Sequence, residues 1–204
     1  MYHRFPGSYT LSRMWEAVRP KPRPPRAAMA HTTPPVETGS AVWRCLNLGC
    51  GNDYMPSTSE RVWVNADIAT TVKADVYFDA FELPWPLQDN EFDLVKAYDF
   101  LEHVPHTVFD KDRRAVKGDG FIVVMDELWR ILKPGGVLEA RFPAFQHKNN
   151  YIDPTHTRQV VKPTFEFYFE KGGSHAFYTT RYWKLLDFDI SQRDNHYARL
   201  RKVL

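Results

Sequence analysis

The sequence has few cysteines and no long apolar segment. Cys45 and Cys50 are its only cysteines, too few and too close together for a disulfide framework. No apolar run approaches the roughly 20 residues of a membrane-spanning helix, and the N-terminus lacks the apolar core of a signal peptide. These absences argue against a membrane protein and against a secreted disulfide scaffold, and they predict a cytoplasmic protein.

Positive charge is concentrated at the start of the chain. Residues 1–40 hold six Lys and Arg against two Glu, whereas residues 41–204 hold 21 basic and 23 acidic residues. Prolines alternate with basic residues over 19–26, which disfavours helix and sheet. We therefore expect a disordered Pro/Arg-rich extension over residues 1–40, with a docking arm as the alternative, and one domain over 41–204. The composition of that domain does not indicate a surface for nucleic-acid phosphates.

Apolar runs and turn signals alternate along the rest of the chain. Helical spacing of Phe121, Met125, Leu128 and Leu132 predicts a helix that ends at 133–136. Because strands precede and follow this helix closely, we expect a parallel sheet with right-handed crossovers, closed by an antiparallel edge. The predicted strands are 42–48, 61–68, 74–78, 92–98, 137–142, 182–191 and 196–204, with a short helix at 164–169.

A glycine-rich turn and an acidic residue follow the first two predicted strands. Gly49 and Gly51 come directly after the first strand, where a turn without Cβ atoms lets the backbone approach a ligand. Asp67 ends the second strand, where a carboxylate can accept hydrogen bonds from both hydroxyls of a ribose. The third glycine of the dinucleotide fingerprint is missing, which disfavours a nicotinamide dehydrogenase.

Five motifs in sequence order resemble those of class I S-adenosylmethionine-dependent methyltransferases. They are Leu46–Asn52, Val64–Ile68, Asp79–Trp85, Phe92–Val104 and Leu128–Gly136. The resemblance implies a Rossmann-like, doubly wound α/β fold and S-adenosylmethionine as the cofactor. The segment Asp153–Arg158 is similar to a subgroup of small-molecule and glycan-modifying enzymes.

The resemblance also implies roles for individual residues. The glycine turn is expected to meet the methionine part of the cofactor, Asp67 the ribose, Asp79 and Ala80 the adenine, and Tyr98 the region under the sulfonium. The full set of expected cofactor-binding residues is Asn47, Gly49, Cys50, Gly51, Asn52, Asp67, Ile68, Asp79, Ala80, Phe81, Tyr98 and Phe100.

One departure from the family concerns the first helix. Only about ten residues separate Gly51 from the second strand, and they include the turn-forming segment 56–59. The long helix that normally follows the first motif is therefore expected to be shortened to a turn or loop. We expect one sheet face to be less covered, so that a partner domain or a second copy in a homodimer can cover it.

The acceptor side carries weaker signals. Asp153 and His156 follow the fifth strand, where substrates bind in such folds, and His156 is suited to removing a proton. The alternative is that both residues only tie down their loop by local hydrogen bonds. His103 is expected at the mouth of the cofactor crevice. Glu102, His103 and His106 complete no recognised ligand spacing, so we expect no metal.

For one further segment and two single residues, two interpretations stay open. The aromatic residues of 165–169 can form an apolar substrate wall or belong to the core. Tyr151 and Arg158 can orient an acidic or sugar-like acceptor or be ordinary surface residues.

The predicted function is methyl transfer to oxygen or nitrogen of a small-molecule or glycan-type acceptor. A nucleic-acid methyltransferase is disfavoured because the segment after the fourth strand reads Tyr98–Leu101, not the Asn/Asp-Pro-Pro-aromatic motif of amino-directed DNA enzymes. A protein methyltransferase and a non-catalytic S-adenosylmethionine-binding module remain alternatives. No membrane partner is expected.

Overall fold

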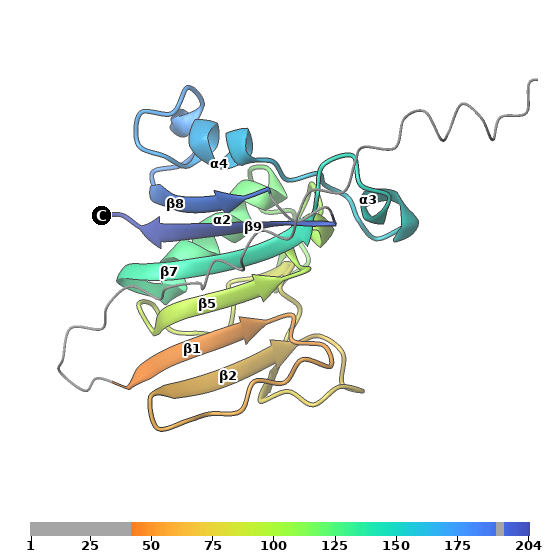
Figure 1. The fold of residues 1–204 in the computed structure, drawn as a ribbon, viewed down its shortest axis with the longest axis vertical. Coiled ribbons are helices and arrows are strands. Elements are labelled where there is room, and N and C mark those ends of the chain that lie inside the picture. Colours follow the sequence, from red (N-terminus) through yellow and green to blue (C-terminus); the bar gives the residue numbers. More distant parts are fainter. Residues whose placement is uncertain (1–41, 191–193) are drawn as a thin grey trace, which may run out of the picture. The chain divides into compact units, whose positions relative to one another are not determined.

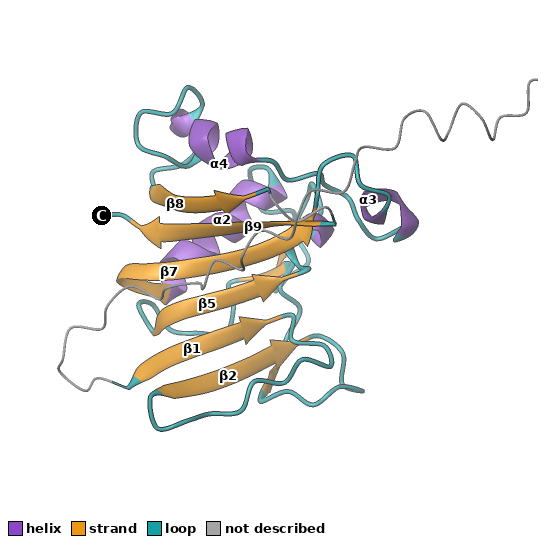
Figure 2. Cartoon of the chain, in the orientation of Figure 1, coloured by secondary structure: helices purple, strands orange, loops and turns teal. Residues whose placement is uncertain are grey.

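The computed structural model of the chain describes residues 42–190 and 194–204, so the extension predicted over residues 1–40 lies outside the described part. Seven strands form one sheet in the order β3-β2-β1-β5-β7-β9-β8 (Figures 1 and 2). These strands are β1 (Trp43–Leu48), β2 (Arg61–Asp67), β3 (Val76–Tyr77), β5 (Phe92–Tyr98), β7 (Leu132–Pro143), β8 (Trp183–Asp189) and β9 (Asn195–Lys202).

Shorter elements surround the sheet. A second, two-stranded parallel sheet pairs β4 (Glu82–Leu83) with β6 (Phe109–Asp110). The α-helices are α2 (Gly120–Ile131), α3 (Asn149–Ile152) and α4 (Lys162–Tyr168), and the 3-10 helices are η1 (Leu101–His103) and η2 (Ala176–Tyr178).

The main sheet is parallel from β3 to β7 and antiparallel from β7 through β9 to β8. This confirms the α/β fold with a mostly parallel sheet and an antiparallel edge. The strand order reverses between β1 and β5, since β2 and β3 extend the sheet on one side of β1 and the later strands extend it on the other. In such sheets ligands bind at this reversal, outside the carboxyl ends of the strands.

The central strands lie where the apolar runs predict them. The last four residues of β1 are buried, and β5 coincides with the predicted strand over 92–98. Both strands are flanked by parallel neighbours and read as nearly continuous apolar runs, as is typical of strands inside a parallel sheet. The predicted strand over 74–78 is shorter in the structure, since only Val76 and Tyr77 pair with β2.

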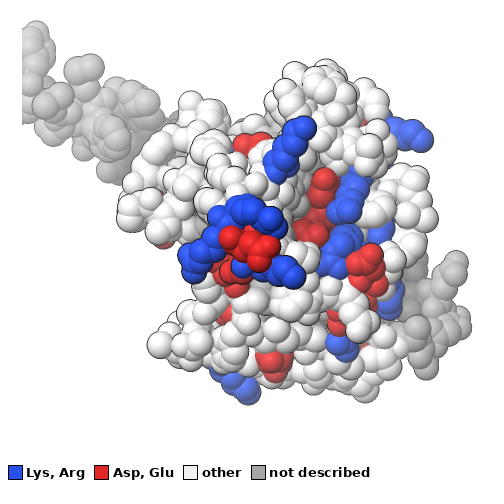
Figure 3. All heavy atoms as spheres, turned by 180° about the vertical axis from the view of Figure 1, so that it is seen from behind, with Lys and Arg blue, Asp and Glu red and all other residues white. Residues whose placement is uncertain are grey.

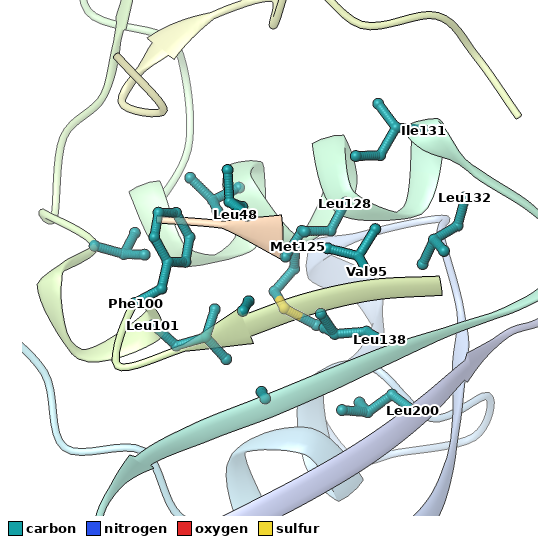
Figure 4. Packing of buried hydrophobic residues seen from close by; sticks show 14 of the residues in the cluster. Leu48, Val95, Phe100, Leu101, Met125, Leu128, Ile131, Leu132, Leu138 and Leu200 are labelled. Carbon is teal, nitrogen blue, oxygen red and sulfur yellow. The ribbon is translucent and has the colours of Figure 1, made fainter. Parts of the chain in front are cut away.

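Helix α2 covers one face of the sheet and supplies much of the core. It passes behind the strands in Figure 1, and the Asp119 side chain caps its start by accepting a hydrogen bond from Phe121 N at 2.9 Å. Met125 and Leu128 are fully buried and point from α2 toward the sheet, where Val95 and Leu138 meet them (Figure 4). The predicted helix is confirmed within one residue at each end.

The predicted boundary between this helix and the next strand needs a correction. The segment 133–136 was expected to separate the two elements, but β7 begins at Leu132, directly after α2. The ladder between β5 and β7 is irregular between Phe92 and Leu94, where this segment lies. A Cβ on Gly136 would lie 2.9 Å from the carbonyl oxygen of Lys133, so the glycine permits this close backbone path.

A loop replaces the first helix. Residues 49–60, all of them described, contain no helix, which confirms the shortened form. Met55 in this loop packs on the sheet face opposite α2, against a small cluster of Cys45, Trp63, Leu94 and Val137. Asn65 holds the loop in place, because its Oδ1 accepts a hydrogen bond from Met55 N at 2.8 Å and its Nδ2 donates to Met55 O at 3.0 Å.

Across residues 42–190 and 194–204, no helix combines the length and the apolar character that a bilayer crossing needs. The longest, α2, has 12 residues, whereas a crossing needs about 20 apolar ones.

We expect Leu128→Ala to lower the free energy of unfolding by about 2–5 kcal/mol, because it leaves a cavity between α2 and the sheet. Leu186→Ala on β8 is the matched control, since Leu186 is 37% exposed, and we expect it to cost less than about 1 kcal/mol. Urea unfolding followed by circular dichroism measures both. Equal losses in the two variants would contradict the placement of Leu128 in the core.

Candidate functional site

A cavity of about 390 Å³ opens at the carboxyl ends of β1, β2 and β5, where the strand order reverses. Its lining combines backbone, aromatic and acidic groups from five loops. The lining residues are Leu48, Gly49, Asp67, Ile68, Phe78, Asp79, Ala80, Phe81, Asp99, Phe100, His103 and Thr155. The structure thus brings seven of the twelve expected cofactor-binding residues and His103 together at one cavity.

Gly49 of the glycine turn lines the cavity next to β1, whereas Gly51 does not line it. Gly49 and Gly51 have φ values of +66° and +48°, a region that residues with a Cβ rarely adopt. A Cβ on Gly49 would make only ordinary van der Waals contact with the Phe100 ring, 3.4 Å away, so the positive φ is what favours glycine at this position. Between them Cys50 is buried and its thiol points to Lys73 O, 3.7 Å away, while Asn52 is exposed. Neither of these two side chains lines the cavity.

Asp67 ties the turn to the end of β2. Its Oδ2 accepts a hydrogen bond from Gly51 N and its Oδ1 accepts one from Ala69 N, both at 2.8 Å. An ionised carboxylate offers about four lone-pair sites, so acceptor capacity remains on each oxygen after these two bonds. Asp67 therefore orders the backbone around it and still presents negative charge to the cavity.

Aromatic rings form another wall of the cavity, next to the glycine turn. Phe81 and Phe100 stack with their ring centroids 5.9 Å apart and an interplanar angle of 26°. The Asp79 side chain sets the path of this segment, because its Oδ1 accepts a hydrogen bond from Phe81 N at 2.8 Å. A flat apolar wall with a carboxylate at its edge suits a planar heteroaromatic ring.

Two expected cofactor residues lie on the other face of the sheet. The Asn47 amide donates to Asp53 O at 2.7 Å and to Asn65 Oδ1 at 3.1 Å, so it supports the loop that replaces the first helix. The Tyr98 ring packs edge-on against Tyr197 with centroids 6.0 Å apart, and burial raises the pKa of Tyr98 to about 12. Neither residue lines the cavity.

The acceptor-side candidates meet at one rim of the cavity. His103 Nδ1 lies 2.9 Å from Thr155 Oγ1, and the His103 ring meets the His156 ring edge-on with centroids 4.7 Å apart. Burial and the neighbouring His156 lower the pKa of His103. Asp153 Oδ1 accepts hydrogen bonds from Thr155 N at 2.8 Å and Thr155 Oγ1 at 2.6 Å, the pattern of an Asx-type turn. His156 and Asp153 do not line the cavity themselves.

Backbone hydrogen bonds hold this rim together. Thr157 N and Arg158 N both donate to the carbonyl oxygen of Glu102 in η1, at 2.9 and 3.1 Å. Burial raises the pKa of the Glu102 carboxyl to about 8. His106 lies apart, 3.5 Å from Asp119.

The other acceptor-side candidates, Arg158, Tyr151 and the aromatic segment 165–169, lie outside the cavity. The Arg158 guanidinium donates to Val104 O and Pro105 O and pairs with Asp119 at 2.9 Å, so its donors serve the protein itself. It also borders a second cavity of about 580 Å³ beside α2 and α4, which contains none of the expected cofactor residues. Phe165 and Phe169 are fully buried, which favours the core alternative for the aromatic segment, and Tyr151 is 64% exposed.

Four lining residues were absent from the expected set: Leu48, Phe78, Asp99 and Thr155. Leu48, Phe78 and Asp99 each adjoin an expected residue, and Leu48 and Asp99 lie inside the motifs Leu46–Asn52 and Phe92–Val104. Thr155 follows Pro154 in the loop after α3, and nothing in its local sequence marks it as a cavity residue.

The strand order, the glycine turn and the cavity at the reversal define a Rossmann-like fold of the class I methyltransferase type. Residues 46–140 match a family model described as "Methyltransferase domain". The matched region is therefore a methyltransferase domain, and its fold is that of S-adenosylmethionine-dependent methyltransferases. No curated protein matches the sequence.

Solved structures agree on the fold. A SAM-dependent methyltransferase from Archaeoglobus fulgidus is 18% identical with a TM-score of 0.51, over 80% of this chain and 87% of that one. The CurJ carbon methyltransferase is 10% identical with a TM-score of 0.55, over 85% of this chain and 50% of that one. CalH, solved in complex with S-adenosylhomocysteine, is 13% identical with a TM-score of 0.50, over 79% and 52%.

We expect Asp67→Ala to weaken S-adenosylhomocysteine binding by about 1–3 kcal/mol, because a charged acceptor is lost and Gly51 N loses its partner. Isothermal titration measures the dissociation constant. Asp187→Ala, at an exposed position on β8, is the control and should leave it unchanged. An unchanged constant for Asp67→Ala would count against the role of this carboxylate.

Proposed function

We propose that this methyltransferase transfers a methyl group from S-adenosylmethionine to oxygen or nitrogen of a small-molecule or glycan-type acceptor. The observation that carries the proposal is the cavity at the strand reversal, where Gly49, Asp67 and Asp79 meet. The domain responsible spans residues 41–204.

The cavity lining supports a specific orientation of the cofactor. Asp67 accepts hydrogen bonds from the ribose hydroxyls, and the Phe81 and Phe100 rings bind the adenine next to Asp79. The Gly49–Gly51 backbone contacts the methionine part. Asn47, Cys50 and Tyr98 act indirectly, since their side chains serve the surrounding structure.

When bound, S-adenosylmethionine supplies an electrophilic methyl group on a sulfonium sulfur. The task of the chain is to hold an acceptor atom in line with that group and to keep water out. Phe81 and Phe100 supply an apolar wall that excludes water. His103 and Thr155 supply polar groups at the rim, where an acceptor hydroxyl or amine can be held.

The charge distribution supports a small acceptor over a nucleic acid. On the face that carries α2, Lys and Arg side chains are interspersed with Asp and Glu, with no continuous basic surface (Figure 3). Arg114 pairs with Asp110 and Asp112, and Arg130 pairs with Glu127 and Asp89. Basic groups already neutralised in this way release few counterions on binding phosphates.

We expect methyl transfer from radiolabelled S-adenosylmethionine to a panel of hydroxylated small molecules and sugars, and none to oligonucleotides or peptides. Asp67→Ala serves as the control for cofactor-dependent transfer and should reduce it. Label in the oligonucleotides or peptides would overturn the proposed acceptor class. Cofactor binding without transfer to any member would favour a non-catalytic binding module.

The sheet face opposite α2 supports a homodimer. On this face Glu139 on β7 and Arg199 on β9 are paired neighbours of opposite charge, 3.4 Å apart, and both side chains are partly exposed. A second copy related by two-fold symmetry can set unlike charges opposite each other.

We expect sedimentation velocity to give the mass of a dimer, and we expect Glu139→Arg to shift the protein toward a monomer, because it replaces the negative charge beside Arg199 with a second positive one. Glu166→Arg on the distant helix α4 is the control and should remain dimeric. A monomer for the unaltered chain would overturn the homodimer.

A further inference from the structure

Three potential metal ligands converge at the rim of the cavity. Glu102 and His103 belong to η1, and His156 comes from the loop after α3. Each offers one ligand atom, and these atoms all lie within 4.8 Å of one another. His103 lines the cavity, so the cluster adjoins the proposed cofactor site without being part of its ribose or adenine contacts.

Glu102 is the unusual member of this cluster. It is 1% exposed, and neither carboxylate oxygen has a hydrogen-bond partner among the described residues. Burying an ionised carboxylate without a partner costs several kcal/mol. The nearby cation Arg141 is paired with Asp99. The two ways to remove this cost are protonation of Glu102 and a bound cation.

The two histidines favour the cation. His156 Nδ1 is buried and has no hydrogen-bond partner, while His156 Nε2 lies 3.9 Å from Asp153 Oδ2. His103 Nδ1 meets Thr155 Oγ1 at 2.9 Å. Histidines that bind metals are oriented in this manner, with one ring nitrogen on the metal and the other facing a carboxylate or another polar group.

The backbone holds the three ligands in position. The loop that carries His156 is fastened to η1 by the hydrogen bonds of Thr157 N and Arg158 N to Glu102 O. Thr157 Oγ1 also donates to Val104 O at 2.8 Å. The ligand set is thus assembled by the fold before any ion binds.

We propose that Glu102, His103 and His156 bind a divalent transition-metal ion such as Zn²⁺, with an open coordination position toward the cavity. Two His and one Glu are a ligand set of catalytic zinc sites, which keep a further position for water or substrate. Imidazole nitrogens favour such ions over Mg²⁺ or Ca²⁺.

The proposal departs from the expectation of no metal. That expectation considered Glu102, His103 and His106, which are close in sequence, but His106 lies beside Asp119 and His156 takes its place. His103 and His156 then serve as ligands and not as free bases, which leaves Thr155 as the polar side chain at the rim that can hold an acceptor. The metal site does not depend on the proposed acceptor class.

Cobalt binding tests the site. The full chain is stripped with a chelator, dialysed and titrated with Co²⁺, whose visible absorption reports its coordination, and then with Zn²⁺ in competition. We expect one ion per chain, displaced by Zn²⁺. Glu102→Gln and His156→Asn should each weaken Co²⁺ binding more than about tenfold. Changing residues that only support metal ligands already costs about 10–100-fold in metal affinity, and a lost ligand should cost at least as much. His106→Asn is the matched control and should bind as the unaltered chain does.

A parallel titration with S-adenosylhomocysteine separates this proposal from the proposed function. Glu102→Gln and His156→Asn should still bind S-adenosylhomocysteine, which shows that they are folded. If one variant does not bind S-adenosylhomocysteine, the Co²⁺ affinity of the other variant tests the metal site. The metal site would be overturned if the unaltered chain bound neither Co²⁺ nor Zn²⁺, or if both variants bound Co²⁺ as tightly as the unaltered chain does. Either result would leave the methyltransferase proposal intact.

Discussion

The carboxylate of Asp67 connects the two loops on which the cavity depends. It accepts one backbone hydrogen bond from the glycine turn after β1 and another from the loop after β2. These loops belong to neighbouring strands and are also joined by the hydrogen bond from Cys50 N to Ala66 O at 3.0 Å and by the Cys50 thiol, which lies 3.7 Å from Lys73 O. The Asp67 carboxylate thus adds to the contacts that hold the two loops together. The proposed ribose contact uses the same side chain.

The shortened first helix changes how the sheet is supported, but it leaves this site in place. A loop held by Asn47 and Asn65 takes the position of the helix and shields a small apolar cluster around Met55. Amide side chains are suited to this task, because each can donate and accept hydrogen bonds with an irregular backbone. The fold thus keeps its ligand-binding edge while the layer opposite α2 is reduced.

Elements with a strong local pattern could be predicted from the sequence. The strands β1, β2 and β5 and the helix α2 each carry their own apolar periodicity and end at turn residues, and Gly49 and Asp67 follow directly from the strand ends. The bulged segment at 133–136 could not be predicted, because its path depends on pairing with Phe92. The same holds for the rim: Thr155 and His156 meet His103 because hydrogen bonds join two segments that are distant in the sequence. These bonds run from Thr157 N and Arg158 N to Glu102 O and between Thr155 Oγ1 and His103 Nδ1.

The place of β9 in the sheet has a consequence for the order in which the chain can fold. β9 follows β8 in the sequence but lies between β7 and β8. During synthesis β8 emerges first and has no strand to pair with until β9 is inserted beside it. The parallel half can assemble earlier, since β1, β2 and β5 precede α2. Until insertion, the unpaired backbone edge of β7 is open to association with other chains, which makes this step the most exposed to aggregation.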